Sequence, residues 1–168
     1  MAGITVTYEL KDSGVLSGLN GLLMMFRNTQ PMMAAIGTGL VASTHMRFVS
    51  QKDPEGQAWA PLNPLYAEGK RNARILTESG RLRNSINDQA GNGWVRVGTN
   101  VLYAAAQHFG VTIVPKKSDH LYFRMGGLFI QADEVTLPSR KFMGISRDDE
   151  DMIADTVQDF VMRLTKAR

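Results

Sequence analysis

Apolar positions recur at helical spacing near both ends of the chain, after a short alternating stretch at its start. Residues 4–10, ITVTYEL, alternate apolar and polar side chains, which predicts a strand with one buried face. Residues 15–30 and 31–51 predict two helices, whose glycines favour close packing of a neighbouring backbone. A third helix is predicted after Ser146, with acidic residues in its first turn and basic residues near its end. Its apolar stripe is formed by Met152, Ile153, Val157, Phe160, Val161 and Leu164.

Between these helices, proline and glycine divide the chain into shorter elements. Residues 53–64, DPEGQAWAPLNP, begin with turn chemistry, and their three prolines predict an extended segment after the turn. Residues 65–76 are predicted to be locally helical. After a break that contains glycine, Leu82 and Ile86 are expected to anchor a short helix or strand.

The following part of the chain predicts short strands around one more helix. Residues 93–99, GWVRVGT, alternate after turn signals and predict a strand. Residues 101–110 predict a short helix that stops at its last residue, a glycine, and residues 111–115 a brief extended piece. Residues 120–132 are predicted to form a β-hairpin, because two apolar, β-rich runs flank a Gly-Gly pair that tolerates positive φ.

Together these elements predict the fold class α+β. We expect a small, mostly antiparallel sheet with packed helices, a long β-hairpin near residues 120–132 and a C-terminal helix. With 168 residues, 43% of them hydrophobic, the chain suits one domain with its own core. That domain is expected to span residues 1–168, with an N-terminal strand and helices in residues 1–52 and a protruding hairpin in residues 116–136.

The composition and the apolar pattern exclude several classes of protein. The absence of cysteine excludes a disulfide scaffold, a thiolate metal site and a cysteine nucleophile. The N-terminus lacks the basic region and apolar run of a secretory signal. The most apolar stretch, residues 32–49, is interrupted by polar residues and falls short of a membrane span. We therefore expect a soluble protein that makes no membrane contact.

Side chains that could carry catalysis are scattered along the chain. The three histidines, His45, His108 and His120, have no metal-ligand spacing, and no nucleophile elbow or P-loop is present. Glu78 and Asp88 could be imagined as the carboxylate pair of a glycoside hydrolase, but nothing in the sequence beyond their presence supports that assignment. We expect no enzyme, no metal and no cofactor; a hydrolase acting on the cell wall is the alternative.

Basic residues form two groups in a chain with a formal net charge of +3. Each group is either a solvated face or a contact for DNA phosphates or for an acidic partner. No aromatic residues are interleaved with them, which argues against stacking on single-stranded bases. The first group is Lys70, Arg71, Arg74, Arg81 and Arg83; the second is Lys116, Lys117, Arg140 and Lys141.

Four segments between residues 53 and 146 resemble, in order, those of a known family. They are DPEGQAWAPLNP, ILTESGRLRNSI, VGTNVLYAAAQHFG and LPSRKFMGIS. This pattern is similar to that of the virion morphogenesis proteins of Mu-like phages, which belong to the tail completion proteins of contractile-tailed phages. The resemblance implies a structural virion protein of the neck or tail completion type, at the head–tail junction, with no catalytic activity and no cofactor. By analogy with sixfold tails, we expect a ring of about six copies around the DNA channel.

The resemblance also suggests partners and surfaces. The expected partners are further copies of the chain, the neighbouring head-closure, tail terminator or tail tube proteins, and genomic DNA in weak, sequence-independent contact. The protein would be made in the host cytoplasm and end in the virion. A small DNA-binding accessory protein of a phage or prophage is the alternative function. The candidate subunit or partner interface consists of Trp59, Leu62, Tyr122, Phe123, Leu128 and Phe129, and the candidate channel-facing residues are Arg81, Arg83, Arg140 and Lys141. For Trp59, packing on the core of its own subunit is the alternative.

Overall fold

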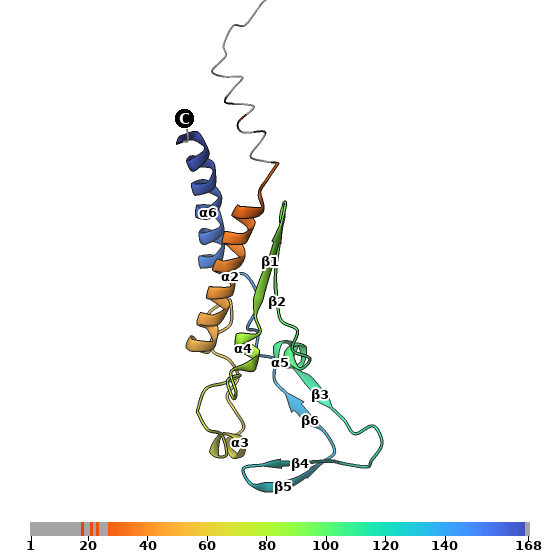
Figure 1. Cartoon of the computed structure of the whole chain (residues 1–168). Coiled ribbons are helices and arrows are strands. Elements are labelled where there is room, and N and C mark those ends of the chain that lie inside the picture. Colours follow the sequence, from red (N-terminus) through yellow and green to blue (C-terminus); the bar gives the residue numbers. More distant parts are fainter. Residues whose placement is uncertain (1–17, 19–20, 22, 24–26, 167–168) are drawn as a thin grey trace, which may run out of the picture.

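The computed structural model describes residues 18, 21, 23 and 27–166, with side chains up to residue 163 (Figure 1). The strand predicted for residues 4–10 lies outside the described residues, as does most of the helix predicted for residues 15–30. The rest of the chain is α+β, as predicted, with its strands in antiparallel pairs.

Two long helices lie side by side and form the upright part of the molecule (Figure 1). They are α2 (Gln30–Ser50) and α6 (Arg147–Lys166), and both confirm the helices predicted from the apolar pattern. A Cβ added to Gly39 in α2 would lie 2.7 Å from the sulfur of Met152 in α6. Glycine at this position therefore permits the close approach of the two helices, as its place in the sequence suggested.

A reciprocal hydrogen-bond pair fixes the start of α6. The backbone N–H of Asp149 donates to Oγ of Ser146 at 3.2 Å, and the backbone N–H of Ser146 donates to Oδ2 of Asp149 at 2.8 Å. This is a capping box with aspartate at its fourth position. The same carboxylate forms a buried ion pair with Arg47 of α2, so one side chain both caps α6 and joins it to α2.

The described strands form three separate two-stranded ladders instead of one continuous sheet. The β1 (Asn87–Gly91) and β2 (Trp94–Gly98) hairpin packs along α2 (Figure 1). Strands β3 (Val111–Ile113) and β6 (Val135–Leu137) pair with each other, and β4 (Leu121–Met125) and β5 (Leu128–Ala132) form the hairpin between them in the chain. The strand at residues 93–99 and the hairpin at residues 120–132 are thus confirmed, whereas β1 and β6 had not been predicted.

Three short helices connect these parts: α3 (Pro64–Glu68), α4 (Arg81–Asn84) and α5 (Ala104–Phe109). The prediction of a helix over residues 65–76 was wrong beyond Glu68. The backbone there makes other contacts. The N–H of Ile75 donates to the side chain of Gln51 at 2.9 Å, and Leu76 has a left-handed backbone conformation with a φ of 55°. The segment is therefore an irregular loop.

The core lies at the C-terminal end of α2, where the short elements meet. The ring of Phe48 packs against Trp59 and against Phe142, with centroids 5.5 Å apart in both pairs. Around these aromatic rings pack the other buried residues of the cluster, Leu82, Ile86, Val101 and Ala104. This is a small core for a chain of this length, and many large apolar side chains of the described residues remain exposed. No described helix is long and apolar enough to cross a membrane.

Candidate functional site

The proline-rich segment is held against the chain just before α6. The indole N–H of Trp59 donates to the carbonyl of Lys141 at 2.9 Å. In return, the Arg140 guanidinium donates to the carbonyls of Ala60 and Pro61 at 2.8 and 2.9 Å. Two of the segments that resemble the family therefore bind each other, and their tryptophan and arginine have structural roles.

Trp59 is only 5% exposed and packs within its own subunit, which was the alternative that the sequence left open. Its indole has no free face for a partner, so we correct its place among the candidate interface residues. The prolines around it favour the extended conformation that brings the ring into the core. Leu62, three residues later, is half-buried and lines the two cavities described below.

Arg140 also needs a correction, because it is 6% exposed and cannot face a channel. Burial lowers the pKa of its guanidinium, and the neighbouring Tyr66 partly offsets this effect. Among the other candidate channel residues, Arg81 and Lys141 are exposed, and Arg83 is half-buried with its Nε donating to Asn84. Arg81 and Arg140 line the same groove, whereas Arg83 and Lys141 do not.

A groove of about 740 Å³ lies between α3, α5, the segment before α4, the β4–β5 hairpin and β6. Its closed side is formed where the hairpin tip meets α3: a Cβ on Gly126 would lie 2.6 Å from the carbonyl oxygen of Leu65, so only glycine fits. Several large apolar side chains line the groove: Leu62, Tyr66, Leu76, Leu82, Tyr103, Phe123, Met125, Val135 and Leu137. Its charged lining residues are Lys70, Glu78, Arg81, Arg124 and Arg140.

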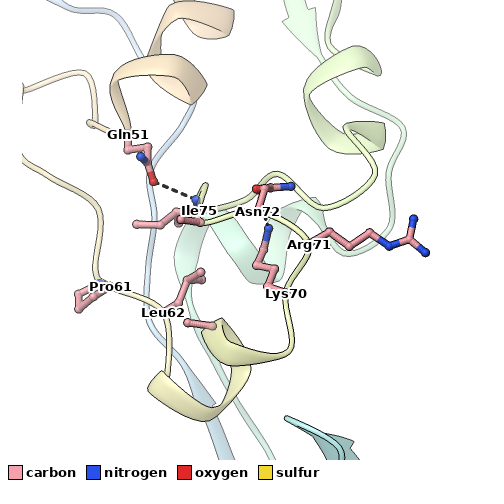
Figure 2. Close-up of a pocket in the computed structure, with 9 residues that line it drawn as sticks. Gln51, Pro61, Leu62, Lys70, Arg71, Asn72 and Ile75 are labelled. Carbon is pink, nitrogen blue, oxygen red and sulfur yellow. Dashed lines mark hydrogen bonds between the residues drawn. The ribbon is translucent and has the colours of Figure 1, made fainter.

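A second cavity, of about 510 Å³, lies beside the loop that follows α3 (Figure 2). Figure 2 shows Leu62 and Ile75 at this cavity, with Arg71 extending away from it. Pro61, Leu62 and Lys70 line both this cavity and the groove. The Lys70 side chain is 2% exposed, and its ammonium group binds Glu78 Oε2 at 2.9 Å, Asn72 Oδ1 at 3.1 Å and the carbonyl of Thr77. All three of its donors are thus used within the loop.

The β4–β5 hairpin presents aromatic side chains on both of its faces. Phe123 is half-buried and faces the groove. Tyr122 and Phe129 lie on the outer face, where their rings stack with centroids 5.8 Å apart. Both are more than half exposed, as is Leu128 beside the turn. The four hairpin residues singled out from the sequence are thus divided between two surfaces.

Sequence reasoning missed the two most exposed large apolar residues near α5. Leu102 is 99% exposed and Phe109 is 75% exposed. In the helix predicted for residues 101–110, their spacing of seven residues was the signal that could have indicated a common face; in the structure α5 begins only at Ala104, and Leu102 lies in the turn before it.

The groups in the groove lining that could act as acid or base include Glu78 and Lys70, which are bound to each other. Glu78 is the one carboxylate that lines it, and Asp88 lies on β1 against Gly37 of α2. The ring of His108 packs edge-on to Phe142 at 5.0 Å, and burial, followed by the charge of Lys141, lowers its pKa. Within the part of the chain that the structure describes, no three histidine or acidic residues form a group that could hold a metal ion.

Comparison with known families identifies the family of this chain. The sequence model described as the phage virion morphogenesis family matches residues 10–162. Comparison with the curated proteins and with the solved structures finds no match.

Proposed function

Because this chain belongs to the phage virion morphogenesis family, we propose that it is a structural protein of the phage head–tail junction. In this proposal, about six copies form a ring around the DNA channel and join or complete the head and tail. The family match across residues 10–162 carries the proposal, since it covers every described helix and strand except the end of α6. A role in building the phage particle follows from the family; the position at the junction is our inference.

Two features of the structure support an assembly role. The core of the described residues is small, and many large apolar side chains are exposed. Two groups of them are Tyr122, Leu128 and Phe129 on the hairpin, and Leu102, Tyr103 and Phe109 in and just before α5. Exposed apolar surface of this kind is typical of protein interfaces. Among the described residues, each two-stranded ladder also has edges that pair with no further strand, and a strand of another chain can add to such an edge.

We also propose that the protein is not an enzyme. The buried cations that line the groove, Lys70 and Arg140, are bound to groups of their own chain. The single lining carboxylate, Glu78, is paired with Lys70. An acid–base mechanism needs at least two groups that converge on one reacting bond, whereas Lys70 and Glu78 of the groove lining are bound to each other.

The proposed partners are further copies of the chain and the head-closure, tail terminator or tail tube proteins next to it. Contact with DNA would be weak and independent of sequence, through exposed cations such as Arg81 and Lys141. Strong phosphate binding would hinder passage of DNA through the ring.

The proposal is tested by deleting the gene from a phage or prophage and examining induced lysates by electron microscopy. We expect DNA-filled heads and separate tails to accumulate, and the chain supplied from a plasmid to restore joined, infectious particles. Antibody labelling of complete particles should place the protein at the junction. Joined, infectious particles in the absence of the gene would refute the proposal.

The second candidate is a DNA-binding accessory protein, which the exposed Arg71, Arg74 and Arg81 favour. Phosphate contacts would make DNA affinity fall steeply with salt, by about 10³–10⁵ between 50 and 200 mM for six to ten contacts. Binding of purified protein to duplex DNA at these two salt concentrations decides between the candidates. Tight DNA binding with a steep salt dependence would favour this second function if particles also assemble normally when the gene is deleted.

A further inference from the structure

Helix α5 (Ala104–Phe109) and the turn just before it present three different surfaces. Val101 and Ala104 are buried in the core. Tyr103 and Gln107, one turn apart, line the groove. The third face consists of Leu102, Ala105 and Phe109, all exposed, and we call it the ridge. At about 100° per residue, Ala105 and Phe109 of the ridge each point about 160° away from the groove-lining Gln107 around the axis of α5.

The groove continues into an apolar floor made by the β3–β6 ladder. Directly opposed residues of an antiparallel pair share one face, and Val111 is opposite Leu137 while Ile113 is opposite Val135. Val135 and Leu137 line the groove. Val111 and Ile113, which share their face, are 38% and 41% exposed. An apolar surface therefore extends from the groove and is left open to solvent.

We propose that the ridge of one copy of the chain docks into the groove of a second copy, an inference that rests on the proposed function. A stable interface buries about 800 Å² per partner, of which on the order of 450 Å² is apolar. An aromatic side chain presents about 150–250 Å². Leu102 and Phe109, 99% and 75% exposed, supply a large part of the apolar area that one side needs, and the groove with its floor supplies the other side.

The charges of the groove favour this occupant over a nucleic acid. The ridge carries no charged residue, and Lys70 and Arg140 are already satisfied by their own chain. An apolar occupant therefore leaves no buried cation unpaired. A nucleic acid would need several free cations in the groove, and only Arg81 and Arg124 at its rim are exposed.

The position of the two surfaces also determines the kind of assembly. An interface between ridge and groove is heterologous, because each copy contributes a different surface to each of its two neighbours. Such interfaces continue from copy to copy until the rotation closes a ring. This is the geometry that a ring around a DNA channel requires.

The test uses two adjacent residues that belong to the two surfaces: Leu102→Asp on the ridge and Tyr103→Asp in the groove. Met46→Asp is the matched control, because Met46 is a 62% exposed apolar residue of α2 that belongs to neither surface. Circular dichroism checks that each variant is folded, and the mass of the full chain is measured by sedimentation over a range of concentrations. We expect wild type and Met46→Asp to form the same ring-sized species, and each of the other variants to remain a monomer.

The most specific test mixes Leu102→Asp with Tyr103→Asp, the two variants that are each expected to remain monomeric. The pair retains one intact ridge and one intact groove, so we expect a one-to-one dimer, twice the monomer mass, and nothing larger. Rings in either single variant, or monomers alone in the mixture, would overturn the proposal. So would a wild-type chain that stays monomeric at all concentrations, or DNA binding that Tyr103→Asp abolishes. If both single variants still form rings, the ridge-and-groove interface is wrong but the proposed role at the head–tail junction still stands. That role is refuted separately, by joined particles in a phage that lacks the gene.

Discussion

At the scale of single residues, the aromatic and basic side chains that stand out in the sequence stabilise the subunit. Trp59 fills the core and donates to the carbonyl of Lys141, while Arg140 donates back to Ala60 and Pro61. Removing either side chain leaves part-buried carbonyl groups without this donor, which costs about 0.5–1.5 kcal/mol for each hydrogen bond lost. Folding, and not partner recognition, therefore accounts for these residue types at these positions.

We predict that Trp59→Ala lowers the free energy of unfolding by about 3–5 kcal/mol, because it leaves a cavity beside Phe48 and removes a buried hydrogen bond. The matched control is Trp94→Ala on β2, where the ring is 45% exposed and lies beside Arg96. Its loss should cost about 1 kcal/mol or less. Urea denaturation of both variants measures the difference; similar costs for the two would contradict the core role of Trp59.

Because the pKa of His108 is lowered in the folded protein, we predict that the stability of the protein depends on pH. Burial lowers its pKa in the folded state below the usual 6.5, and the charge of Lys141 lowers it further. The unfolded chain therefore binds more protons as the pH falls through 6.5, and folding stability decreases over that range and below it, down to the folded pKa. His108→Asn, which keeps a polar atom near the N–H of Phe142, should reduce this loss. Denaturation at pH 7.5 and 5.5 checks this; an unchanged difference between the two pH values would contradict it.

At the scale of elements, one carboxylate connects the two long helices. Burial raises the pKa of Asp149, but hydrogen bonds from Ser43 and Ser146 and the charge of Arg47 outweigh it and hold the pKa below its usual value. Asp149 therefore contributes stability above its unfolded pKa of about 3.8, and this contribution is lost as the pH falls through its lower folded value.

We predict that Asp149→Asn destabilises the protein by about 3 kcal/mol at pH 7, because it leaves the buried Arg47 without a counter-charge. Asp148→Asn, an exposed change in the same turn, should cost about 0.5 kcal/mol. The difference between wild type and Asp149→Asn should shrink below pH 4, because the carboxylate of the unfolded wild-type chain begins to bind protons there while that of the folded chain stays charged to lower pH. Thermal unfolding at pH 7 and pH 3 measures it, and a gap that stays constant would argue against the ion pair.

The elements themselves were predictable where the pattern is local. The apolar stripe and acidic first turn revealed α6, and the Gly-Gly pair between apolar runs revealed the β4–β5 hairpin. In contrast, β1 has the sequence NDQAG, which has low strand propensity, and it forms because it pairs with β2 and packs on α2. The local sequence predicts a helix over residues 69–76, but hydrogen bonds to distant side chains, such as that from Ile75 N–H to Gln51, hold this backbone in another conformation. The groove depends on contacts between segments far apart in the chain, and no local pattern encodes it.

At the scale of the whole molecule, stability and assembly depend on different residues. The buried cluster around Phe48 and Phe142 holds the subunit together, whereas Leu102 and Phe109 contribute almost nothing to it because they are exposed. A chain with a small core and large exposed apolar surfaces gains stability when copies associate, since association favours the folded state by mass action.

This separation leads to a prediction about thermal unfolding of the wild-type chain. Its melting temperature should rise with protein concentration, because a hundredfold excess over the dissociation constant adds about 2.7 kcal/mol, which is several degrees for a protein of this size. Leu102→Asp should melt at one temperature at every concentration, equal to that of the dilute wild type, since Leu102 is 99% exposed in the single subunit. Met46→Asp should follow the wild-type concentration dependence. A Leu102→Asp variant whose melting temperature still rose with concentration as in wild type would place the contacts between copies on another surface, such as the outer face of the β4–β5 hairpin.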